Sequence, residues 1–328
     1  MTVLVTGATG FIGLHVVKDL AETGRSVLAL DKNPPDRLAE SFLRGVRASV
    51  RFLQVDLTAP ETLKAAVREP VAAIVHAAVV TSTPEVEARE PERVVAVNIL
   101  GTVRMLEVAA RVGTRRFVYI SSSGVYGETD PADALSEAAP VRLGSLYTMT
   151  KYAGEQLVAE ANGPRLAAAT LRIAAPYGPT ERPTGARTVM SAIYVLAHAA
   201  VERQTVRLRG ADRARDWTYA ADIARAARLL IDAPSLAHGC YNVSSGAVAP
   251  LAEVAEALRR IEPGFAWHPA SDAADADGAA AQRRGPLDTS RIRALGFAPR
   301  YSLDDGLGET VAWLRRFREV DTDNFDRG

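Results

Sequence analysis

The sequence predicts an α/β protein built on a doubly wound parallel sheet, with a smaller C-terminal domain. Three observations predict this fold class. Short β-branched and apolar runs alternate with longer segments of helical periodicity, which is the pattern of β-α-β units. A glycine-rich turn separates the first apolar run from the first helical segment. The chain has 328 residues, 48% of them apolar, which is enough for one elaborated domain or two.

The first β-α-β unit occupies residues 1–31. Residues 2–6 form an apolar run suited to a buried parallel strand. The turn that follows holds Gly7, Gly10 and Gly13. In such a turn the first glycine permits the tight bend, the second lets a pyrophosphate approach the backbone, and the third lets the helix pack against the sheet. The helix N-terminus offers free N–H groups to phosphates, so we predict a dinucleotide site here.

An acidic residue after the second strand indicates which dinucleotide binds. Residues 26–30 form that strand, and Asp31 follows it, about 20 residues past the turn as in dinucleotide-binding units. A carboxylate at this place binds both hydroxyls of the adenosine ribose and repels a 2′-phosphate. The neighbouring Lys32 would weaken this repulsion. We therefore predict NAD rather than NADP as the cofactor.

The third predicted strand, residues 50–55, ends at Asp56. A carboxylate at the carboxyl end of a parallel strand lies on the ligand side of an open α/β sheet. Asp56 therefore either accepts a hydrogen bond from the adenine amino group or caps the helix that starts near Pro60.

Two further features point to the cofactor. The fourth predicted strand, residues 71–75, is followed by the small residues Ala77 and Ala78, which let the dinucleotide backbone pass close by. Asn98 interrupts the apolar face of a long helix predicted over residues 91–113. A buried asparagine needs hydrogen-bond partners, and we expect its amide to bridge strand ends.

The chemical signature of the chain is Tyr147 with Lys151, four residues apart and hence on one face of a helix. A lysine ammonium lowers the pKa of a nearby phenol, and a positive nicotinamide ring adds to this effect. The tyrosine then takes a proton from a substrate hydroxyl as hydride leaves for NAD⁺. The fifth strand, residues 115–120, runs into a serine-rich segment at 121–127, where a hydroxyl holds the same substrate oxygen.

The remaining segments continue the alternation of strands and helices. We expect strands at 166–173, 206–208 and 241–243, helices at 188–202, 220–231, 251–260 and 304–317, and an Ala-rich loop at 269–282. These elements suggest a Rossmann-type NAD-binding domain over residues 1–175, to which the chain returns at about 215–247. Residues 176–328 then form mainly the smaller C-terminal substrate-binding domain.

Composition excludes several functional classes. Lys plus Arg and Asp plus Glu both number 39, so a nucleic-acid partner is not expected. The single cysteine, Cys240, excludes an internal disulfide framework and fits a reducing cytosol. No apolar run approaches a membrane span, and the strand that begins at Thr2 leaves no room for a signal peptide. We expect a cytoplasmic protein without a membrane partner or a metal.

Together these residues resemble the extended short-chain dehydrogenase/reductases, the NAD-dependent sugar epimerase/dehydratase group. The resemblance covers nearly the whole chain. Besides the glycine turn and Asp31 it rests on the segments 56–57, 76–78, 98–102, 121–127, 147–151, 172–179, 215–219, 288–290 and 295–296.

The resemblance implies a role for each matching residue. Tyr147 matches the catalytic acid/base, Lys151 its partner, and Ser122 the catalytic Ser/Thr, with Ser123 as the fallback. The implied cofactor contacts are Gly7, Gly10, Phe11, Ile12, Gly13, Asp31, Asp56, Leu57, Ala77, Ala78, Val79, Asn98, Tyr147 and Lys151. The implied substrate contacts are Ser122, Ser123, Tyr147 and Arg215, with Arg283 or Arg284 as a further contact to a substrate diphosphate.

Two positions depart from the family pattern. Dehydratases of the family carry an Asp-Glu pair directly after the catalytic Ser/Thr, where this chain has Ser123 and Gly124, so dehydration is disfavoured. Many nucleotide-sugar enzymes carry Asn where this chain has Ala175, which weakens the assignment of a nucleotide-sugar substrate.

We expect an NAD-dependent nucleotide-sugar epimerase that works through a transient keto intermediate. One alternative is a net NAD-dependent dehydrogenase of a free sugar, sugar acid or other polyol-like alcohol. The other is a non-enzymatic NAD(H)-binding regulator, although such proteins usually lose the Tyr/Lys pair that this chain keeps. The family also implies a homodimer, formed through the helices near 91–113 and 147–161.

Overall fold

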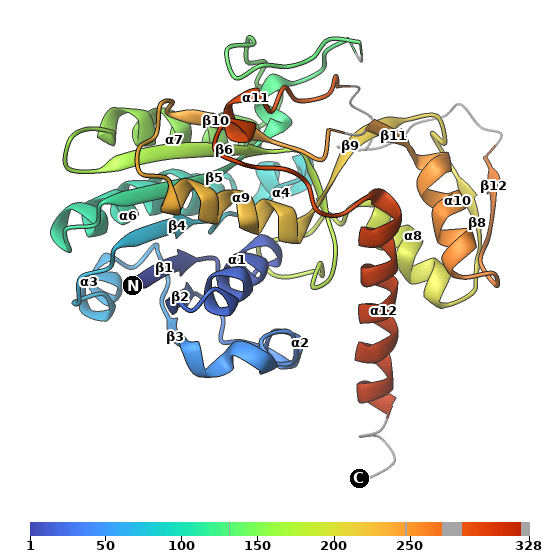
Figure 1. Cartoon of the computed structure of the whole chain (residues 1–328), viewed down its shortest axis with the longest axis horizontal. Helices are drawn as coiled ribbons and strands as arrows, with labels where there is room; N and C mark the ends of the chain where they lie inside the picture. Colours follow the sequence, from blue (N-terminus) through green and yellow to red (C-terminus); the bar gives the residue numbers. More distant parts are fainter. Residues whose placement is uncertain (131, 247, 271–283, 323–328) are drawn as a thin grey trace.

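The computed structural model describes residues 1–130, 132–246, 248–270 and 284–322 (Figure 1). A seven-stranded parallel sheet runs in the order β10-β6-β5-β4-β1-β2-β3. Its strands are β1 (Thr2–Thr6), β2 (Ser26–Asp31), β3 (Val50–Gln54), β4 (Ala73–His76), β5 (Arg116–Ser122), β6 (Ala167–Ile173) and β10 (Cys240–Val243). The strand order reverses between β1 and β4, which is where ligands bind in open α/β sheets. The predicted fold class is confirmed.

Helices cover both faces of this sheet (Figure 1). One face packs on α1 (Phe11–Glu22) and α9 (Ala220–Asp232), and the other on α6 (Gly101–Arg111) and α7 (Leu146–Ala161). Alternation along β1 shows why both faces are apolar. Val3 and Val5 lie in the core with α1, whereas Leu4 lies in the core with α6, because successive strand residues point to opposite faces.

Two small sheets lie beside the central one. The first has the order β11 (Val248–Pro250), β9 (Ala214–Tyr219), β7 (Ala175–Tyr177), and the second pairs β12 (Ala266–Pro269) with β8 (Thr205–Leu208). They pack with α8 (Ala192–Val201), α10 (Leu251–Ile261) and α12 (Leu303–Thr322) around a separate apolar core that includes Trp217 and Phe265. The division at residue 175 stays a prediction.

Several elements differ from the expectation. The connection after Asp31 contains α2 (Arg37–Phe42) and the 3₁₀ turn η1 (Arg44–Ser49). The Asp36 carboxylate accepts from the Ala39 N–H and so caps α2. The long helix at 91–113 is divided into α5 (Pro91–Val95), a π-helical turn η2 (Ala96–Leu100) and α6. The helix expected from residue 188 begins only at Ala192, where Ser191 caps it.

Some short elements had no counterpart in the sequence prediction. They are β7, β9, β11, β12, α4 (Pro84–Arg89), η3 (Ser123–Tyr126) and α11 (Ser290–Arg293), whereas α3 (Pro60–Ala66) is the helix expected near Pro60. Most of the predicted Ala-rich loop, together with Arg283, lies outside the described residues. No helix in the described part of the chain combines the length and apolarity that crossing a membrane requires.

Candidate active site

The glycine turn lies at the reversal of strand order, after β1 and beside the loop that follows β4. Gly7 has φ +65°, and a Cβ there would come within 2.8 Å of the Ala78 backbone. A Cβ on Gly13 would lie 1.9 Å from the Gly7 carbonyl oxygen. At the N-terminus of α1 the N-cap is Gly10, without a side-chain cap. The turn therefore presents backbone N–H groups and a closely approachable surface, which fits a dinucleotide phosphate.

Asp31 closes β2 next to this turn. Its Oδ2 accepts from the Thr9 N–H at 3.1 Å and its Oδ1 from the Asn33 N–H at 3.0 Å. The carboxylate is thus held beside the glycine turn, as the predicted contact with the adenosine ribose requires.

Asp56 makes different contacts from those expected. Its Oδ1 accepts from the Thr58 N–H at 2.8 Å and the Thr58 hydroxyl at 2.7 Å, and its Oδ2 lies 3.0 Å from the Lys32 ammonium. The N-cap of α3 is Ala59, without a side-chain cap, so the expectation that Asp56 caps this helix is wrong. The carboxylate instead closes the turn before the helix. Its predicted adenine contact stays a prediction, and Lys32 is engaged with Asp56.

The other predicted cofactor residues surround the same reversal point. Ala77 and Ala78 approach the Gly7 backbone, and the Ala78 N–H donates to the Thr6 hydroxyl at 3.2 Å. Phe11 and Leu57 are buried, Leu57 within the core on the α6 side. Ile12, Ala77, Ala78 and Val79 are half-buried.

Asn98 lies in the π-helical turn and is buried. Its Oδ1 accepts from the Val80 N–H at 2.8 Å, and its Nδ2 donates to the Val80 carbonyl and the Thr150 hydroxyl at 3.1 and 3.0 Å. The amide therefore joins the loop after β4 to α7, on which Tyr147 lies. Its predicted cofactor contact stays a prediction.

Tyr147 and Lys151 lie one turn apart on α7. Burial raises the pKa of Tyr147, while a hydrogen bond with Ser122 and the charge of Arg187 oppose that rise. Lys151 is 3% exposed and donates from Nζ to the Ile120 carbonyl at 2.7 Å. Burial lowers the pKa of Lys151 to about 7, against the raising effect of the Glu155 charge. The predicted effect of Lys151 on the pKa of Tyr147 stays a prediction.

The structure separates the two candidate serines. Ser122 ends β5 and accepts from the Gly124 N–H at 3.0 Å, and its hydroxyl lowers the pKa of Tyr147. Ser123 is buried, and its hydroxyl accepts from Arg284 at 3.2 Å. Of the two, Ser122 is therefore the hydroxyl beside Tyr147.

Two arginines extend the site toward the smaller sheets. Arg215 lies on β9, and Arg284 donates to the Gly127 carbonyl at 2.9 Å as well as to Ser123. Burial, and then the charge of Arg215, lower the pKa of Arg284 to about 10. Arg215 and Arg284 therefore repel each other, and a bound anion would relieve this repulsion.

A segment at 179–187 crosses the glycine turn and was not predicted as part of the site. The Pro179 carbonyl is 2.9 Å from His15 Nε2, and Arg182 donates to the Thr9 carbonyl at 2.9 Å. The Arg187 guanidinium lies 5.5 Å from the centre of the Phe11 ring and pairs with Glu181. Neither arginine stands in a recognisable motif, so no local signal could have identified them.

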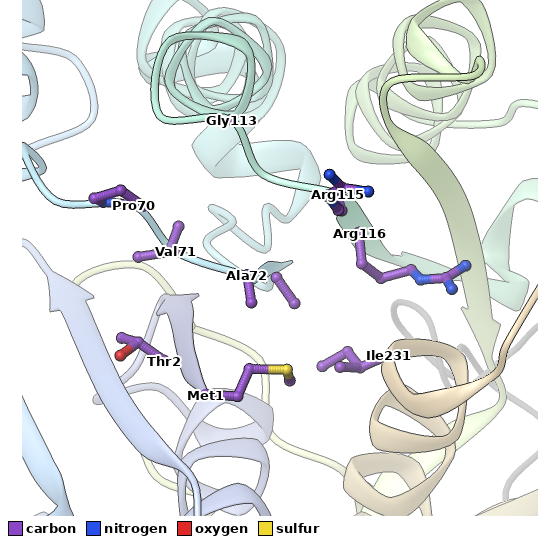
Figure 2. A pocket seen from close by; sticks show the side chains of 10 residues that line it. Met1, Thr2, Pro70, Val71, Ala72, Gly113, Arg115, Arg116 and Ile231 are labelled. Carbon is purple, nitrogen blue, oxygen red and sulfur yellow. The ribbon is translucent and has the colours of Figure 1, made fainter.

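A separate cavity of about 460 Å³ lies at the amino ends of the central strands, opposite the glycine turn (Figure 2). Thr2, Ala73 and Arg116, which begin β1, β4 and β5, line it with Met1 and Ile231. Ligands in open α/β sheets bind outside the carboxyl ends of the strands, so this cavity, at their amino ends, is not the candidate active site.

Comparison with known proteins agrees with this geometry. The model of the family described as "NAD dependent epimerase/dehydratase family" matches residues 3–244. A UDP-glucose 4-epimerase of Mycolicibacterium smegmatis is 30% identical over 324 residues, 96% of this chain and 99% of that protein. A dTDP-glucose 4,6-dehydratase of Streptomyces niveus is also 30% identical, over 96% of this chain and 93% of its own length.

A solved structure extends the similarity to the fold. The UDP-glucose 4-epimerase of Thermus thermophilus, in complex with NAD, superimposes with a TM-score of 0.79 at 28% identity. The match covers 96% of this chain and 99% of that one. Sequence and fold thus agree along nearly the whole length of the chain.

Proposed function

Because this chain belongs to the NAD-dependent epimerase/dehydratase family, we propose that it is a nucleotide-sugar 4-epimerase-like enzyme that works through a transient keto intermediate. The family's cofactor is NAD, which when bound supplies the hydride acceptor. The observation that carries the proposal is the position of Tyr147, beside the Ser122 hydroxyl that lowers its pKa and one helical turn from the buried Lys151.

Each of the three residues has a defined task in the proposed reaction. Ser122 holds the substrate oxygen, and Tyr147 takes its proton and later returns it. Lys151 is fixed to the Ile120 carbonyl at 2.7 Å, and its ammonium favours the phenolate of Tyr147. The glycine turn and Asp31 hold the cofactor phosphates and adenosine ribose.

Epimerisation is favoured over dehydration by the residues that follow Ser122. The Ser123 hydroxyl is engaged by Arg284, and a side chain at position 124 would be in tight contact with its neighbours. A Cβ on Gly124 would lie 3.1 Å from the Ser122 hydroxyl and 3.3 Å from the Thr148 methyl group. Elimination of water requires acidic side chains at these two positions. This chain has none there, and an acidic side chain in place of Gly124 would be sterically disfavoured.

Arg215 and Arg284 support a substrate that carries phosphate. Both guanidinium groups are half-buried, and burial lowers the pKa of each. The charge of Arg215 lowers the pKa of Arg284 further. A nucleotide diphosphate between them would offset this repulsion, which is the role we propose for the pair.

The second candidate function is net oxidation of a free sugar or sugar acid, and Ala175 favours it. This residue opens β7 at the position where many nucleotide-sugar enzymes of the family place an asparagine against the substrate. Without that amide, recognition of a nucleotide-linked sugar depends more heavily on the arginines.

A substrate screen separates the two functions. Purified protein is assayed with UDP-, dTDP- and GDP-sugars and with free aldoses and sugar acids, following NADH absorbance and product stereochemistry together. Epimerised nucleotide sugars without accumulated NADH support the proposal. Accumulation of NADH with free sugars alone would replace it by the dehydrogenase.

The catalytic assignment is tested by Tyr147→Phe, which keeps the ring and removes the transferable proton. We expect turnover to fall about 10²- to 10⁴-fold, the usual range for a general acid/base. The NAD affinity should change little, because the phenol makes no essential charge contact with the cofactor. Tyr152→Phe is the matched control, because Tyr152 is a half-buried tyrosine on the same helix. Near-normal turnover of Tyr147→Phe would refute the assignment.

We also propose that the enzyme is a homodimer. Leu100 and Met149 are 45% and 50% exposed, and they belong to η2 and α7, which pack against each other. The neighbouring Val95, Ile99 and Val103 are half-buried. An apolar surface on these adjacent helices suits a self-complementary interface.

A further inference from the structure

A carboxylate from α4 holds the first turn of the helix that carries Tyr147. Glu87 accepts hydrogen bonds from the backbone N–H groups of Leu146 at 3.0 Å and Tyr147 at 2.9 Å. Its Oε1 also accepts from the Ser82 hydroxyl at 2.8 Å. One side chain thus joins the loop after β4 to the backbone of Tyr147 itself.

This contact completes the N-terminus of α7. A helix leaves its first N–H groups without partners in the helix. Ser145, the N-cap, accepts from the Thr148 N–H at 3.2 Å, and Glu87 takes the two N–H groups before it. A carboxylate at this end is further favoured by the helix dipole. The backbone from which the Tyr147 side chain extends is therefore fixed by a residue 60 positions away.

Glu87 is itself held firmly. The Thr83 hydroxyl caps α4 by accepting from the Val86 N–H at 3.3 Å, and Pro84 opens the helix. Val86 is buried with Val80, and Leu146 packs against the same cluster. Because α4 and the start of α7 share this small core, the carboxylate has little freedom to move away from Tyr147.

We propose that Glu87 is a positioning residue for Tyr147, which sets the placement of the phenol against Ser122 and links it to the loop after β4. The proposal rests on the proposed role of Tyr147. The phenol must meet both Ser122 and the substrate oxygen, and misplacement of a reacting group by about 1 Å costs on the order of 100-fold in rate.

Glu87→Asp tests the geometry while keeping the charge. The shorter side chain cannot reach both N–H groups, so the phenol should lose part of its contact with Ser122. That contact lowers the pKa of Tyr147, so we expect this pKa to rise by about 0.5 or more. It is measured without substrate as the phenolate absorbance difference between each protein and its Tyr147→Phe counterpart. Glu85→Asp, an exposed acid on the same helix, should leave the titration unchanged.

Turnover provides a second readout once a substrate is known. We expect Glu87→Asp to lower kcat about tenfold or more with little change in KM. Combined with Tyr147→Phe it should cause no further loss, because both changes act through one hydroxyl. Additive losses, or an unchanged Tyr147 titration in folded Glu87→Asp, would overturn the proposal. If Tyr147→Phe itself had no effect on turnover, the proposed function would fail instead.

Should Glu87→Asp fail to fold, Ser82→Ala supplies the test. It leaves the Glu87 carboxylate in place and removes one of its three hydrogen bonds. We expect the pKa of Tyr147 to rise in Ser82→Ala as well, but by less than in Glu87→Asp. An unchanged titration and unchanged kcat in Ser82→Ala would then count against the proposal.

Discussion

Lys151→Met should make the ligand-free protein more stable at pH 6 while abolishing its activity. Lys151 is 3% exposed, and burial lowers its pKa from 10.5 to about 7. At pH 6 the Lys151 amine of the folded protein is therefore charged, although its buried surroundings disfavour the charged form. Methionine is apolar and similar in length, so it occupies the same space without that cost.

The magnitude follows from two opposing contributions. The difference between 10.5 and about 7 corresponds to about 5 kcal/mol. Methionine cannot donate to the Ile120 carbonyl, which Lys151 Nζ reaches at 2.7 Å, and loss of that partner costs about 1–3 kcal/mol. We therefore expect the free energy of unfolding to rise by about 2–4 kcal/mol at pH 6.

The pH dependence distinguishes this cause from ordinary repacking. Between pH 7 and 10.5 the unfolded chain binds more protons at Lys151 than the folded protein does, so the stability of the parent rises with pH. The advantage of methionine should be complete below pH 7 and should shrink as the pH rises. Near pH 10.5 it should reverse to a net loss, because the burial penalty of the amine is then almost gone while the missing hydrogen bond to the Ile120 carbonyl still costs about 1–3 kcal/mol.

Urea unfolding of ligand-free protein at pH 6 and pH 9.5 measures the effect. Lys64→Met is the matched control, because Lys64 is exposed on α3, and its free energy of unfolding should change by less than about 0.5 kcal/mol at both values. Equal destabilisation by Lys151→Met at pH 6 and pH 9.5 would refute the reasoning.

Three further outcomes are expected. NAD should bind at least about tenfold, or about 1.4 kcal/mol, more tightly than NADP, and Asp31→Ala should reduce this difference in affinity. Titration of the protein with both cofactors measures the difference, and equal affinities in the parent protein would contradict the prediction. Arg172→Met removes the arginine partner of the buried Glu155 carboxylate, which the guanidinium meets at 2.6 Å. The free energy of unfolding in urea should fall by about 3–5 kcal/mol, and adding Glu155→Leu should recover most of this loss. Leu100→Glu should convert the dimer to a monomer in light scattering, whereas Val195→Glu, on the exposed side of α8, should not; a monomeric parent at micromolar concentration would exclude the dimer.

The central sheet was predictable because its pattern is local. The strands β1 to β6 are apolar runs that alternate with helices, and the glycine turn marks the first crossover. The smaller sheets have no such signal. β7 has three residues, and it exists because Ala175 pairs with Trp217, far away in the sequence. Such strands are defined by their partners rather than by their own composition.

The candidate site was predictable to the same extent. Tyr147, Lys151, Asp31 and the glycines stand in recognisable spacings. The structure places the glycines and Asp31 at the reversal of strand order, and it places Lys151, one helical turn from Tyr147, at the end of β5. Glu87, on α4, and Arg187, in the segment before α8, were missed because each acts on Tyr147 from a distant part of the sequence. Their contribution depends on which distant segments pack together in the fold, and residue spacing along the chain does not reveal that packing.

The segment over the glycine turn shows how tertiary contacts override local preference at this site. Thr180 has φ 72°, a left-handed conformation that is unfavourable for a β-branched residue. It is 2% exposed, and within the described residues its hydroxyl has no hydrogen-bond partner. The conformation persists because the chain is held on both sides of Thr180. The Pro179 carbonyl lies 2.9 Å from His15 Nε2, and Arg182, two residues after Thr180, donates to the carbonyls of Thr180 and Thr9. Strain of this kind survives only where surrounding contacts over-determine the backbone.

The π-helical turn at Asn98 and the buried amine of Lys151 are further departures from local preference. Thr180, Asn98 and Lys151 all lie on elements that meet at the carboxyl ends of the strands. Local rules are broken where the site is assembled, as expected if selection acts on the site's geometry and the rest of the fold supplies the stability.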